Sequence, residues 1–397
     1  MPLARLTKIS VFLLFGLIVA QVATAQTETV LYNFMGSGNY GDGARPYGGV
    51  IRDAKGNLYG TTEVGGSSSN CYPDGCGTVF EMTATGYEKI LHSFNANGTD
   101  GYYPFSGLVM DKNGNLYGTT SQGGTYGDGT VFEISATGTE TILHSFDGNE
   151  GDGSGLYYAG LVMDSKGNLY GTTPDGGMYG GGTVFEIGAN GTYTILHNFA
   201  YKAGDGFWPL AGLVMDKSGN LYGTTNAGGA YDQGTAFELS ATGTETILHS
   251  FTSYWTDGLI PVSVLIMDKI GNLFGTTNAG GANNSGTAFV LVGYGADGIL
   301  YNFGNNATDG IFPYAGLVMD KRGNLYGETS QGGTYGDGTV FEISTNGTYT
   351  ILHSFAGGTT DGIAPYGGLA IDGKGNLYGT TVAGGQWGYG ILFKLVP

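Results

Sequence analysis

The chain has 397 residues and a formal net charge of −18, and 78 of its residues are glycine. Only 12% of the residues are charged, whereas 41% are hydrophobic and 13% aromatic, which is enough apolar material for a packed core. A strongly acidic surface repels phosphate backbones, so we expect no nucleic-acid partner.

The first 25 residues are typical of a secretory signal peptide. Arg5 and Lys8 precede an apolar run over residues 9–22, and the small residues 23–25 follow it. Removal of this segment leaves 13 basic and 33 acidic residues, a net charge of −20. The apolar run is short for a membrane span and no second one follows. We therefore expect residues 26–397 to be a monomer without a transmembrane segment, either secreted, periplasmic or on the outer surface.

The two cysteines, Cys71 and Cys76, are separated by four residues. In an oxidising compartment such a pair is expected to close a local disulfide. The chain-entropy contribution of so small a ring is roughly 2 kcal/mol. The bond would therefore hold one loop in place rather than the whole fold. A metal site would need further ligands nearby in the sequence, and this segment offers none.

The string GNLYGTT recurs seven times with small variations. Its copies begin 58, 53 and then 52 residues apart, at Gly56, Gly114, Gly167, Gly219, Gly271, Gly323 and Gly375. Self-similarity at a constant period is the signature of a repeat architecture.

Each repeat is predicted to form four short strands. In the second repeat these are residues 106–111, 115–120, 130–135 and 140–146, which we name A to D, with A nearest the central axis. Tight glycine-containing turns join A to B and C to D. No helical period of 3.6 residues is present. Four antiparallel strands repeated about every 40 to 50 residues are typical of propeller blades.

The two ends of the repeat region complete each other. Residues 28–34 match strand D, and residues 390–396 match strand C. The seventh blade would therefore take its outer strand from the N-terminus, which leaves no open sheet edge. An open solenoid would instead need capping units, and the sequence shows none. We predict an all-β fold in which residues 26–397 form a seven-bladed β-propeller closed by the N-terminal strand.

GNLYGTT, a Gly-Gly pair, GTVFEI and ETILHSF follow one another in each unit and resemble the GloVer (Gloeo-Verruco) tandem repeat of exported bacterial proteins. The resemblance covers essentially residues 26–397. It implies a propeller-like exported protein and brings no settled biochemical activity with it. Members of that family often carry a C-terminal anchor, whereas this sequence ends at Pro397 just after a strand. The resemblance therefore does not lead us to expect surface anchoring.

The two faces of such a propeller differ. The D-to-A and B-to-C connections emerge on one side, the loop face, and the A-to-B and C-to-D turns emerge on the other, the turn face. The turns are short and nearly the same in every repeat, whereas the loops are longer and vary. Rigid scaffolds carry function on variable loops, so we predict ligand binding on the loop face.

Aromatic residues in these loops are the candidate ligand contacts. They are Trp208 and Trp255 in D-to-A loops, Trp387 in a B-to-C loop, and Tyr126, Tyr179, Tyr231 and Tyr335 at positions equivalent to Trp387. Rings on wet loops suit stacking on sugar faces or anchoring a protein partner. The alternative is that they pack on the neighbouring blade.

Every D-to-A loop contains an aspartate followed by glycine. The seven are Asp42, Asp100, Asp152, Asp205, Asp257, Asp309 and Asp361. Seven carboxylates near the channel mouth could hold Ca²⁺, which prefers oxygen ligands. Asp-Gly is also favourable turn chemistry. Because all repeats share it, we favour the turn interpretation and keep Ca²⁺ as a weaker alternative; we expect no other cofactor.

All five histidines occupy one position of strand D, where the other two copies have Tyr32 and Tyr301. They are His92, His144, His197, His249 and His353. Neighbouring copies would lie about 17 Å apart, far beyond metal-bond lengths of about 2 Å. We interpret the position as a packing slot with a polar tip.

The sequence contains no nucleophile elbow, zinc-protease helix or phosphate loop, and we predict no catalytic residues. Our leading hypothesis is an exported binding module that engages a glycan or an extracellular protein through its loop face. A propeller-type polysaccharide lyase or hydrolase, or an enzyme like the streptogramin-inactivating propellers, would need an asymmetric cluster at the channel mouth. Arg45 and Lys202 are the only basic residues available there. A structural envelope protein is the third alternative.

Overall fold

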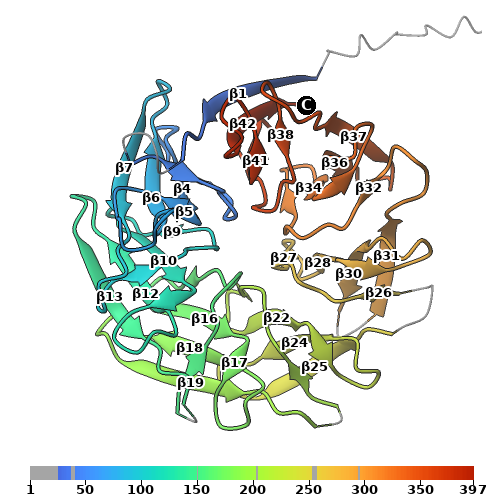
Figure 1. Ribbon diagram of the computed structural model, residues 1–397. Helices are drawn as coiled ribbons and strands as arrows, with labels where there is room; N and C mark the ends of the chain where they lie inside the picture. The colour runs from blue at the N-terminus through green and yellow to red at the C-terminus, as the bar shows by residue number, and fades with distance from the viewer. Residues whose placement is uncertain (1–25, 37–40, 150, 203, 253–256, 294–295) are drawn as a thin grey trace, which may run out of the picture.

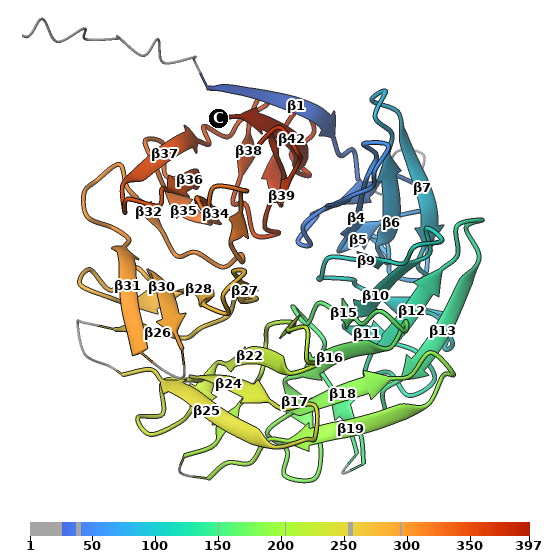
Figure 2. The ribbon, with the colours of Figure 1, turned by 180° about the vertical axis from the view of Figure 1, so that it is seen from behind.

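Seven four-stranded antiparallel sheets surround a central axis (Figures 1 and 2). The computed structural model describes residues 26–36, 41–149, 151–202, 204–252, 257–293 and 296–397, and within these segments it contains strands but no helix. The predicted all-β propeller with seven blades is confirmed. The segment predicted as a signal peptide lies outside the described residues.

Each blade consists of strands A, B, C and D in chain order. Blades 1 to 3 are β3 (Ile51–Arg52), β4 (Leu58–Thr62), β6 (Thr78–Met82), β7 (Glu88–Ser93); β9 (Val109–Met110), β10 (Leu116–Thr120), β12 (Thr130–Ile134), β13 (Glu140–Ser145); and β15 (Val162–Met163), β16 (Leu169–Thr173), β18 (Thr183–Ile187), β19 (Tyr193–Asn198). Blades 4 and 5 are β21 (Val214–Met215), β22 (Leu221–Thr225), β24 (Thr235–Leu239), β25 (Glu245–Ser250); and β27 (Ile266–Met267), β28 (Leu273–Thr277), β30 (Thr287–Val292), β31 (Ala296–Asn302). Blades 6 and 7 are β33 (Val318–Met319), β34 (Leu325–Thr329), β36 (Thr339–Ile343), β37 (Tyr349–Ser354); and β39 (Ala370–Ile371), β40 (Leu377–Thr381), β42 (Ile391–Val396), β1 (Thr27–Asn33).

The N-terminal strand closes the ring as the sequence predicts. β1 pairs antiparallel with β42, from Thr27 opposite Val396 to Asn33 opposite Ile391, and Figure 1 shows the two strands side by side. The main-chain groups of β42 are therefore paired on both sides, which removes the exposed edge that an incomplete last blade would present.

Strand A is shorter than the sequence predicts. In blade 2 only Val109 and Met110 pair with strand B, although residues 106–111 have a strand-like sequence. The carbonyl of Ser106 instead accepts a hydrogen bond from Thr61 Oγ1 of blade 1, at 2.8 Å. The inner segment therefore joins neighbouring blades as well as completing its own sheet.

Each D-to-A loop also pairs with the segment after strand B, which the sequence did not reveal. The seven two-stranded ribbons are β2 (Gly43–Ala44) with β5 (Val64–Gly65), β8 (Gly101–Tyr102) with β11 (Gln122–Gly123), β14 (Gly153–Ser154) with β17 (Asp175–Gly176), β20 (Gly206–Phe207) with β23 (Ala227–Gly228), β26 (Gly258–Leu259) with β29 (Ala279–Gly280), β32 (Gly310–Ile311) with β35 (Gln331–Gly332), and β38 (Gly362–Ile363) with β41 (Ala383–Gly384). These ribbons stiffen the base of the loop face.

Phenylalanine pairs hold neighbouring blades together. Phe94, at the end of strand D of blade 1, packs edge-to-face on Phe132 in strand C of blade 2, with 5.1 Å between ring centroids, and both side chains are fully buried. The pair recurs at every junction, including Phe34 with Phe80 and Phe355 with Phe393. Burying one such ring contributes roughly 2 to 3 kcal/mol.

The glycine of GNLYGTT makes room for this core. A Cβ on Gly118 would come within 2.6 Å of Phe132 Cζ, which is closer than carbon atoms can pack. The same clash would occur at the equivalent glycine of each blade, as at Gly327 with Phe341. Packing therefore explains why the second glycine of GNLYGTT recurs in every blade.

The predicted disulfide is present. Cys71 and Cys76 are bonded, with Cα atoms 5.1 Å apart, in the B-to-C loop of blade 1. No helix among the described residues is long and apolar enough to cross a membrane.

Candidate functional site

Five B-to-C loops present an exposed aromatic ring at the same position of the repeat, and we call this set the outer aromatic ring. Its members and their exposed fractions are Tyr126 64%, Tyr179 55%, Tyr231 54%, Tyr335 64% and Trp387 48%. Each loop is tied to strand D beside it; for example, Thr125 N–H donates to Ser145 Oγ at 3.3 Å. Between the two interpretations of the sequence, these exposures favour rings that face solvent over rings packed on the next blade.

A second group of aromatic residues, the inner aromatic arc, surrounds the central axis. It runs through neighbouring blades in the order Tyr314, Tyr366, Tyr47, Phe105 and Tyr158. Successive ring centroids are 5.0, 5.5, 5.3 and 6.1 Å apart. Four of the five, all except Tyr47, line a central cavity of about 360 Å³. Burial of the Tyr158 hydroxyl, together with the neighbouring Tyr47 and Tyr314, raises its pKa to about 12.

The inner aromatic arc breaks the sevenfold repetition. The equivalent positions in blades 4 and 5 are aliphatic, Leu210 and Val262, so one side of the cavity mouth is aromatic and the other is not. Sequence reasoning missed this arc, although a signal was present. All seven residues lie four positions before the first residue of strand A, as Phe105 does before Val109, and a repeat alignment of that column shows five aromatic residues together.

The tryptophans have different environments. Trp208 is 38% exposed, and its Nε1–H donates to Tyr201 Oη at 3.1 Å while its ring packs on Phe207. Its φ of 59° lies in the left-handed region, which costs a non-glycine residue roughly 1 to 2 kcal/mol. The Trp208 carbonyl accepts the Asn226 N–H at 2.9 Å, and this bond holds the unusual conformation. Trp255 lies outside the described residues.

The basic residues named for an enzymatic alternative pair locally. Arg45 lies 3.9 Å from Glu63 near the inner aromatic arc. Lys202 lies 3.6 Å from Asp205, one of the seven D-to-A aspartates. They belong to different blades and form separate pairs, so they supply no joint cluster on the axis.

The seven D-to-A aspartates do not form a ring at the channel mouth. Each is 3–9% exposed and lies beside the outer strand D of its own blade. Asp152 is typical: its carboxylate accepts hydrogen bonds from Asp147 N–H, Gly153 N–H and His144 Nε2–H at 3.1, 2.8 and 2.9 Å. Although burial opposes it, these bonds hold the pKa of Asp152 below its usual value. The seven carboxylates therefore lie in separate slots, and the weaker alternative of one Ca²⁺ site shared by a ring of aspartates has no ring to rest on.

In the slots other than that of Asp257, a third residue enters from strand D of the following blade. In the slot of Asp152 this residue is Tyr193, which stacks on His144 with 3.8 Å between centroids. In four slots it is a glutamate. Glu88 enters the slot of Tyr32 and Asp42, and in the other three slots the histidine, aspartate and glutamate ligand atoms all lie within 4.8 Å of one another. These three sets are His92–Asp100–Glu140, His197–Asp205–Glu245 and His353–Asp361–Glu28.

The glutamates of these slots have raised pKa values. Burial, together with the negative charge of Asp100, raises the pKa of Glu140 to about 7, although His92 opposes the shift. Burial and Asp205 raise the pKa of Glu245 to about 7 in the same way. The sequence argument compared histidines only with one another and so missed carboxylates that arrive from the loop and from the next blade.

Another buried glutamate interrupts the repeat in blade 6. Glu328 replaces the first threonine of GTT, which in other blades donates to a carbonyl of the next blade, as Thr172 does to Ala211 at 2.8 Å. Glu328 is fully buried and accepts only the Gly368 N–H at 3.1 Å, while its Oε1 has no partner. Burial raises the pKa of Glu328 to about 8.

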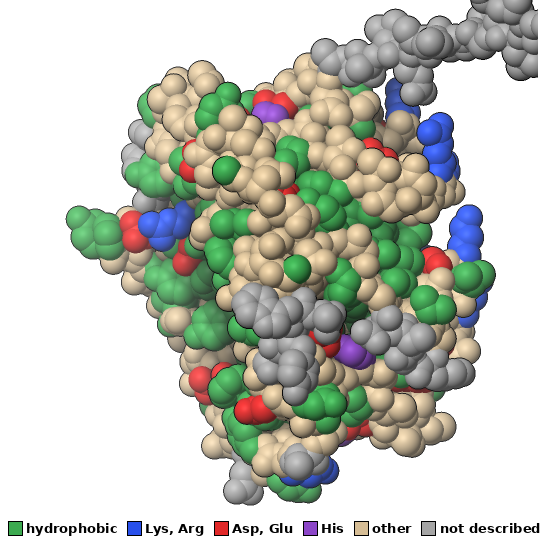
Figure 3. Space-filling view, turned by 90° about the vertical axis from the view of Figure 1, so that its right-hand side faces the viewer, with side chains coloured by type: hydrophobic (Ala, Val, Ile, Leu, Met, Phe, Trp, Pro, Cys, Tyr) green, Lys and Arg blue, Asp and Glu red, His purple; other side chains and the backbone are tan. Residues whose placement is uncertain are grey.

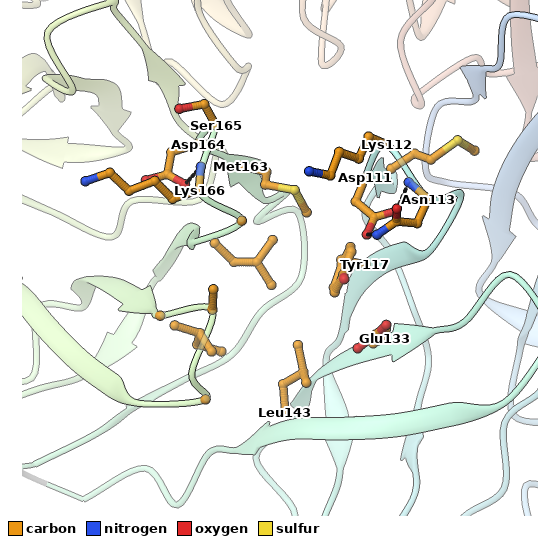
Figure 4. Close-up of a pocket in the computed structure, with 17 residues that line it drawn as sticks. Asp111, Lys112, Asn113, Tyr117, Glu133, Leu143, Met163, Asp164, Ser165 and Lys166 are labelled. Carbon is orange, nitrogen blue, oxygen red and sulfur yellow. Dashed lines mark hydrogen bonds between the residues drawn. The ribbon is translucent and has the colours of Figure 1, made fainter.

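Shallow grooves separate the blades on the turn face. One, of about 560 Å³, lies between blades 2 and 3 and includes Tyr117, Leu143 and Met163, with Lys112 at its rim (Figure 4). Grooves of similar volume occupy the equivalent place between blades 5 and 6 and between blades 6 and 7. Their recurrence shows that they follow from the repeat rather than from one specialised site.

The turn face also carries most of the basic residues. Every A-to-B turn contributes one exposed lysine: Lys55, Lys112, Lys166, Lys217, Lys269, Lys321 and Lys374. Lysine and arginine side chains accordingly gather along one side of the disc in Figure 3. The loop face has Arg45 and Lys202 as its basic side chains, so it is the more acidic of the two.

Comparison with known proteins supports the fold and the family. The structure resembles the extracellular domains of two hybrid two-component systems from B. thetaiotaomicron, with TM-scores of 0.57 and 0.55 and sequence identities of 10% and 13%. These alignments cover 92% and 89% of this chain and 39% of each of the other chains. A 6-phosphogluconolactonase of Bacteroides uniformis aligns with a TM-score of 0.49 and 13% identity, over 79% of this chain and 86% of the other.

A search of curated proteins finds no match. The model of the Gloeobacter/Verrucomicrobia repeat matches residues 15–154, 68–289 and 256–397, which together span nearly the whole sequence. This match agrees with the sevenfold GNLYGTT repeat and with the blade that each copy forms. The chain belongs to the Gloeobacter/Verrucomicrobia repeat family.

Proposed function

We propose that the protein is an exported, non-catalytic binding module that holds a neutral polysaccharide through its loop face. The observation that carries the proposal is the outer aromatic ring, in which five large side chains remain 48–64% exposed at equivalent positions. Soluble proteins seldom leave a set of large apolar side chains exposed on one face without an interaction to serve. The disulfide in blade 1 suits an oxidising compartment outside the cytoplasm.

The chemistry of the loop face favours sugars without charge. Aromatic rings with a polar edge offer an apolar face to the C–H groups of a sugar ring and leave its hydroxyls to water or to nearby polar groups. The acidic loop face would repel uronic-acid or sulfated polymers. Rings repeated from blade to blade match a ligand that is itself a repeated unit, because several weak contacts on one chain add avidity.

The central cavity also fits a sugar ligand, but one much shorter than the polymer that the outer aromatic ring would hold. Its volume of about 360 Å³ lies near the lower end of the range for small-molecule pockets. The inner aromatic arc lines one side of it, so a short sugar segment entering the cavity would stack on one side only. This site would select the end of a chain, whereas the outer aromatic ring would hold its length.

Pull-down on insoluble cellulose, chitin, xylan and β-1,3-glucan, with pectin and alginate as acidic polymers, tests the proposal. We expect retention on at least one neutral polymer and none on the acidic ones. Replacing Tyr126, Tyr179, Tyr231, Tyr335 and Trp387 by alanine should weaken retention at least tenfold, because each lost stacking contact removes of the order of 1 kcal/mol.

A matched control replaces exposed apolar residues of the turn face. Tyr87 and Ile270 are 69% and 84% exposed in a C-to-D and an A-to-B turn, so Tyr87→Ala with Ile270→Ala should leave retention unchanged. Equal binding by the five-residue variant and the parent would contradict the proposed surface. Absence of binding to every neutral polymer would contradict the proposed ligand. Separate Trp208→Ala and Trp255→Ala variants measure the contribution of the D-to-A loops.

A further inference from the structure

Five of the seven slots between strand D of one blade and strand D of the next contain a histidine, and these five fall into two geometries. In three of them a histidine donates a normal hydrogen bond to the aspartate: the Nε2 to Oδ2 distances are 2.9 Å for His144–Asp152, 3.0 Å for His249–Asp257 and 3.1 Å for His353–Asp361. In the other two, which we call open slots, the histidine makes no such hydrogen bond. His92 Nε2 lies 3.4 Å from Asp100 Oδ2, and neither His92 nor His197 has a hydrogen-bond partner at Nε2.

The aspartates of these two open slots have also changed their contacts. In the closed slots Oδ1 accepts the N–H of the following glycine, as Asp152 does from Gly153 at 2.8 Å. In the open slots Asp100 Oδ1 and Asp205 Oδ1 have no hydrogen-bond partner at all. Both residues are more than nine-tenths buried, at 7% and 3% exposure. An unpaired carboxylate oxygen in such a place is costly unless a cation compensates it. Among the described residues, the first slot contains no lysine or arginine partner, whereas in the second slot the exposed Lys202 ammonium lies 3.6 Å from Asp205 Oδ2 and supplies part of this charge.

The third residue completes the open slots. Glu140 Oε1, likewise unpartnered, lies 3.4 Å from His92 Nε2, and Glu245 Oε2 lies 3.6 Å from His197 Nε2. Two ligand atoms bound at about 2.0 to 2.1 Å in tetrahedral geometry are separated by about 3.3 to 3.4 Å. The two Nε2–carboxylate distances of 3.4 Å in the first slot match this spacing, and the 3.6 Å distance in the second slot is slightly longer.

We propose that His92–Asp100–Glu140 and His197–Asp205–Glu245 each bind one divalent first-row transition-metal ion, with Zn²⁺ as the representative occupant. One imidazole and two carboxylates suit Zn²⁺, whereas Ca²⁺ requires six or more oxygen ligands. The three side chains leave one coordination position for water. This inference is independent of the proposed glycan binding.

The position of the ligands assigns the ion a role. For the first site, His92 belongs to β7 of blade 1, Asp100 to the loop between blades 1 and 2, and Glu140 to β13 of blade 2. The second site joins blades 3 and 4 in the same way through β19 and β25. Each ion therefore cross-links the outer strands of adjacent blades. The partial exposure of His92 and Glu140, at 18% and 16% of their side chains, gives the ion a route from solvent.

The third set of histidine, aspartate and glutamate, His353–Asp361–Glu28, can be compared with the two open slots. His353 and Asp361 are already hydrogen-bonded at 3.1 Å, and Asp361 Oδ1 accepts the Gly362 N–H at 2.7 Å. His353 Nε2 and both carboxylate oxygens of Asp361 therefore have protein partners, and only Glu28 Oε1 has none, so we treat this site as closed. The proposal therefore predicts two bound ions per chain and not three.

The test is titration of the chelator-treated full protein with Zn²⁺ alone, at neutral pH and followed by calorimetry. We expect about two saturable sites per chain. Glu140→Gln and Glu245→Gln should each remove one site, and the double variant should remove both. The matched control, His144→Gln in a closed slot, should retain two. Saturating Zn²⁺ should raise the melting temperature of the parent by several degrees and leave that of the double variant unchanged.

A second measurement uses the parent protein alone and therefore does not depend on the folding of any variant. Co²⁺ bound to the parent should give visible ligand-field absorption bands that Zn²⁺ displaces, with the same stoichiometry. The proposal is overturned by the absence of saturable Zn²⁺ binding to the parent, which would leave a proton shared by the acids as the compensating cation. It is equally overturned if the double variant keeps both sites, or if a third site appears and Glu28→Gln removes it.

Discussion

The two faces of the disc are built from the same seven repeats, and the side chains that recur on them have different environments. On the turn face the recurring aspartate of the A-to-B turn is satisfied internally: Asp216 accepts hydrogen bonds from Ser218 N–H, Asn220 N–H and Asn220 Nδ2–H at 2.8, 2.9 and 2.9 Å. On the loop face, rings such as Tyr231 extend into solvent. A residue repeated sevenfold is thus structural when its groups are satisfied and a candidate for binding when they are exposed.

Both faces depend on closure of the ring, and breaking it should have the largest effect. Deletion of Thr27–Asn33 removes the partner of β42 along its whole length and exposes an unpaired edge. We expect loss of cooperative unfolding and formation of oligomers, measured by calorimetry and size-exclusion chromatography. A monomer that melts within about 2 °C of the parent would show that β1 is dispensable.

The turn face should lose stability when one of its internal networks is removed. Asp216→Ala deletes four hydrogen bonds and leaves their donors unpaired, so we expect destabilisation by about 2 to 3 kcal/mol in urea unfolding. Lys217→Ala, at an exposed position of the same turn, should change stability by less than about 0.5 kcal/mol. Equal effects of the two substitutions would contradict a structural role for the turn aspartates.

Glu328 gives a pH-dependent comparison between blades. Its pKa rises from 4.5 to about 8 on folding, so the folded state is favoured when the carboxyl is protonated. That contribution is complete below about pH 4.5 and is lost as the pH rises through 8. Glu328→Thr restores the residue of the other blades, and we expect it to stabilise the protein by roughly 1 to 3 kcal/mol at pH 8.

The gain from Glu328→Thr should shrink towards pH 5. The difference between the urea midpoints of the variant and the parent, measured across this range, isolates Glu328 from the other buried glutamates. A difference that does not vary with pH would refute the assigned titration.

The exposed rings should contribute least to stability. Tyr231→Ala on the loop face is expected to change the free energy of unfolding by less than about 0.5 kcal/mol. Tyr222 is half-buried on strand B, and its hydroxyl lies 3.3 Å from Asp216. Replacing Tyr222 by alanine should therefore lower the free energy of unfolding clearly more. Urea unfolding of the two variants makes the comparison, and a large loss for Tyr231→Ala would indicate that the ring is part of the core.

The fold could be predicted from the sequence because each blade repeats the same information. The spacing of GNLYGTT gives the number of blades, and the match of residues 28–34 to strand D gives the closure by β1. The disulfide between Cys71 and Cys76 followed from their separation and the expected compartment. The short length of strand A could not be predicted, because the carbonyl of Ser106 accepts a hydrogen bond from Thr61 of the preceding blade instead of extending the strand.

The site was predicted only in part. The outer aromatic ring was identified by repeat position, but its exposure depends on how each loop packs. The slot of His92 needs Glu140 from the next blade, and such contacts appear only when blades are placed side by side. The inner aromatic arc was visible in the sequence as the repeat column that holds Tyr47 and Tyr366, and it required the closed ring to become one surface.

Hydrogen–deuterium exchange with and without a saturating oligosaccharide, cut from the neutral polymer retained in the pull-down, tests most directly whether the loop face is the binding surface. We predict slower exchange in the B-to-C loops that carry Tyr126, Tyr179, Tyr231, Tyr335 and Trp387, and unchanged exchange in the A-to-B turns. Protection confined to the A-to-B and C-to-D turns would place the ligand on the opposite side of the disc and contradict the account.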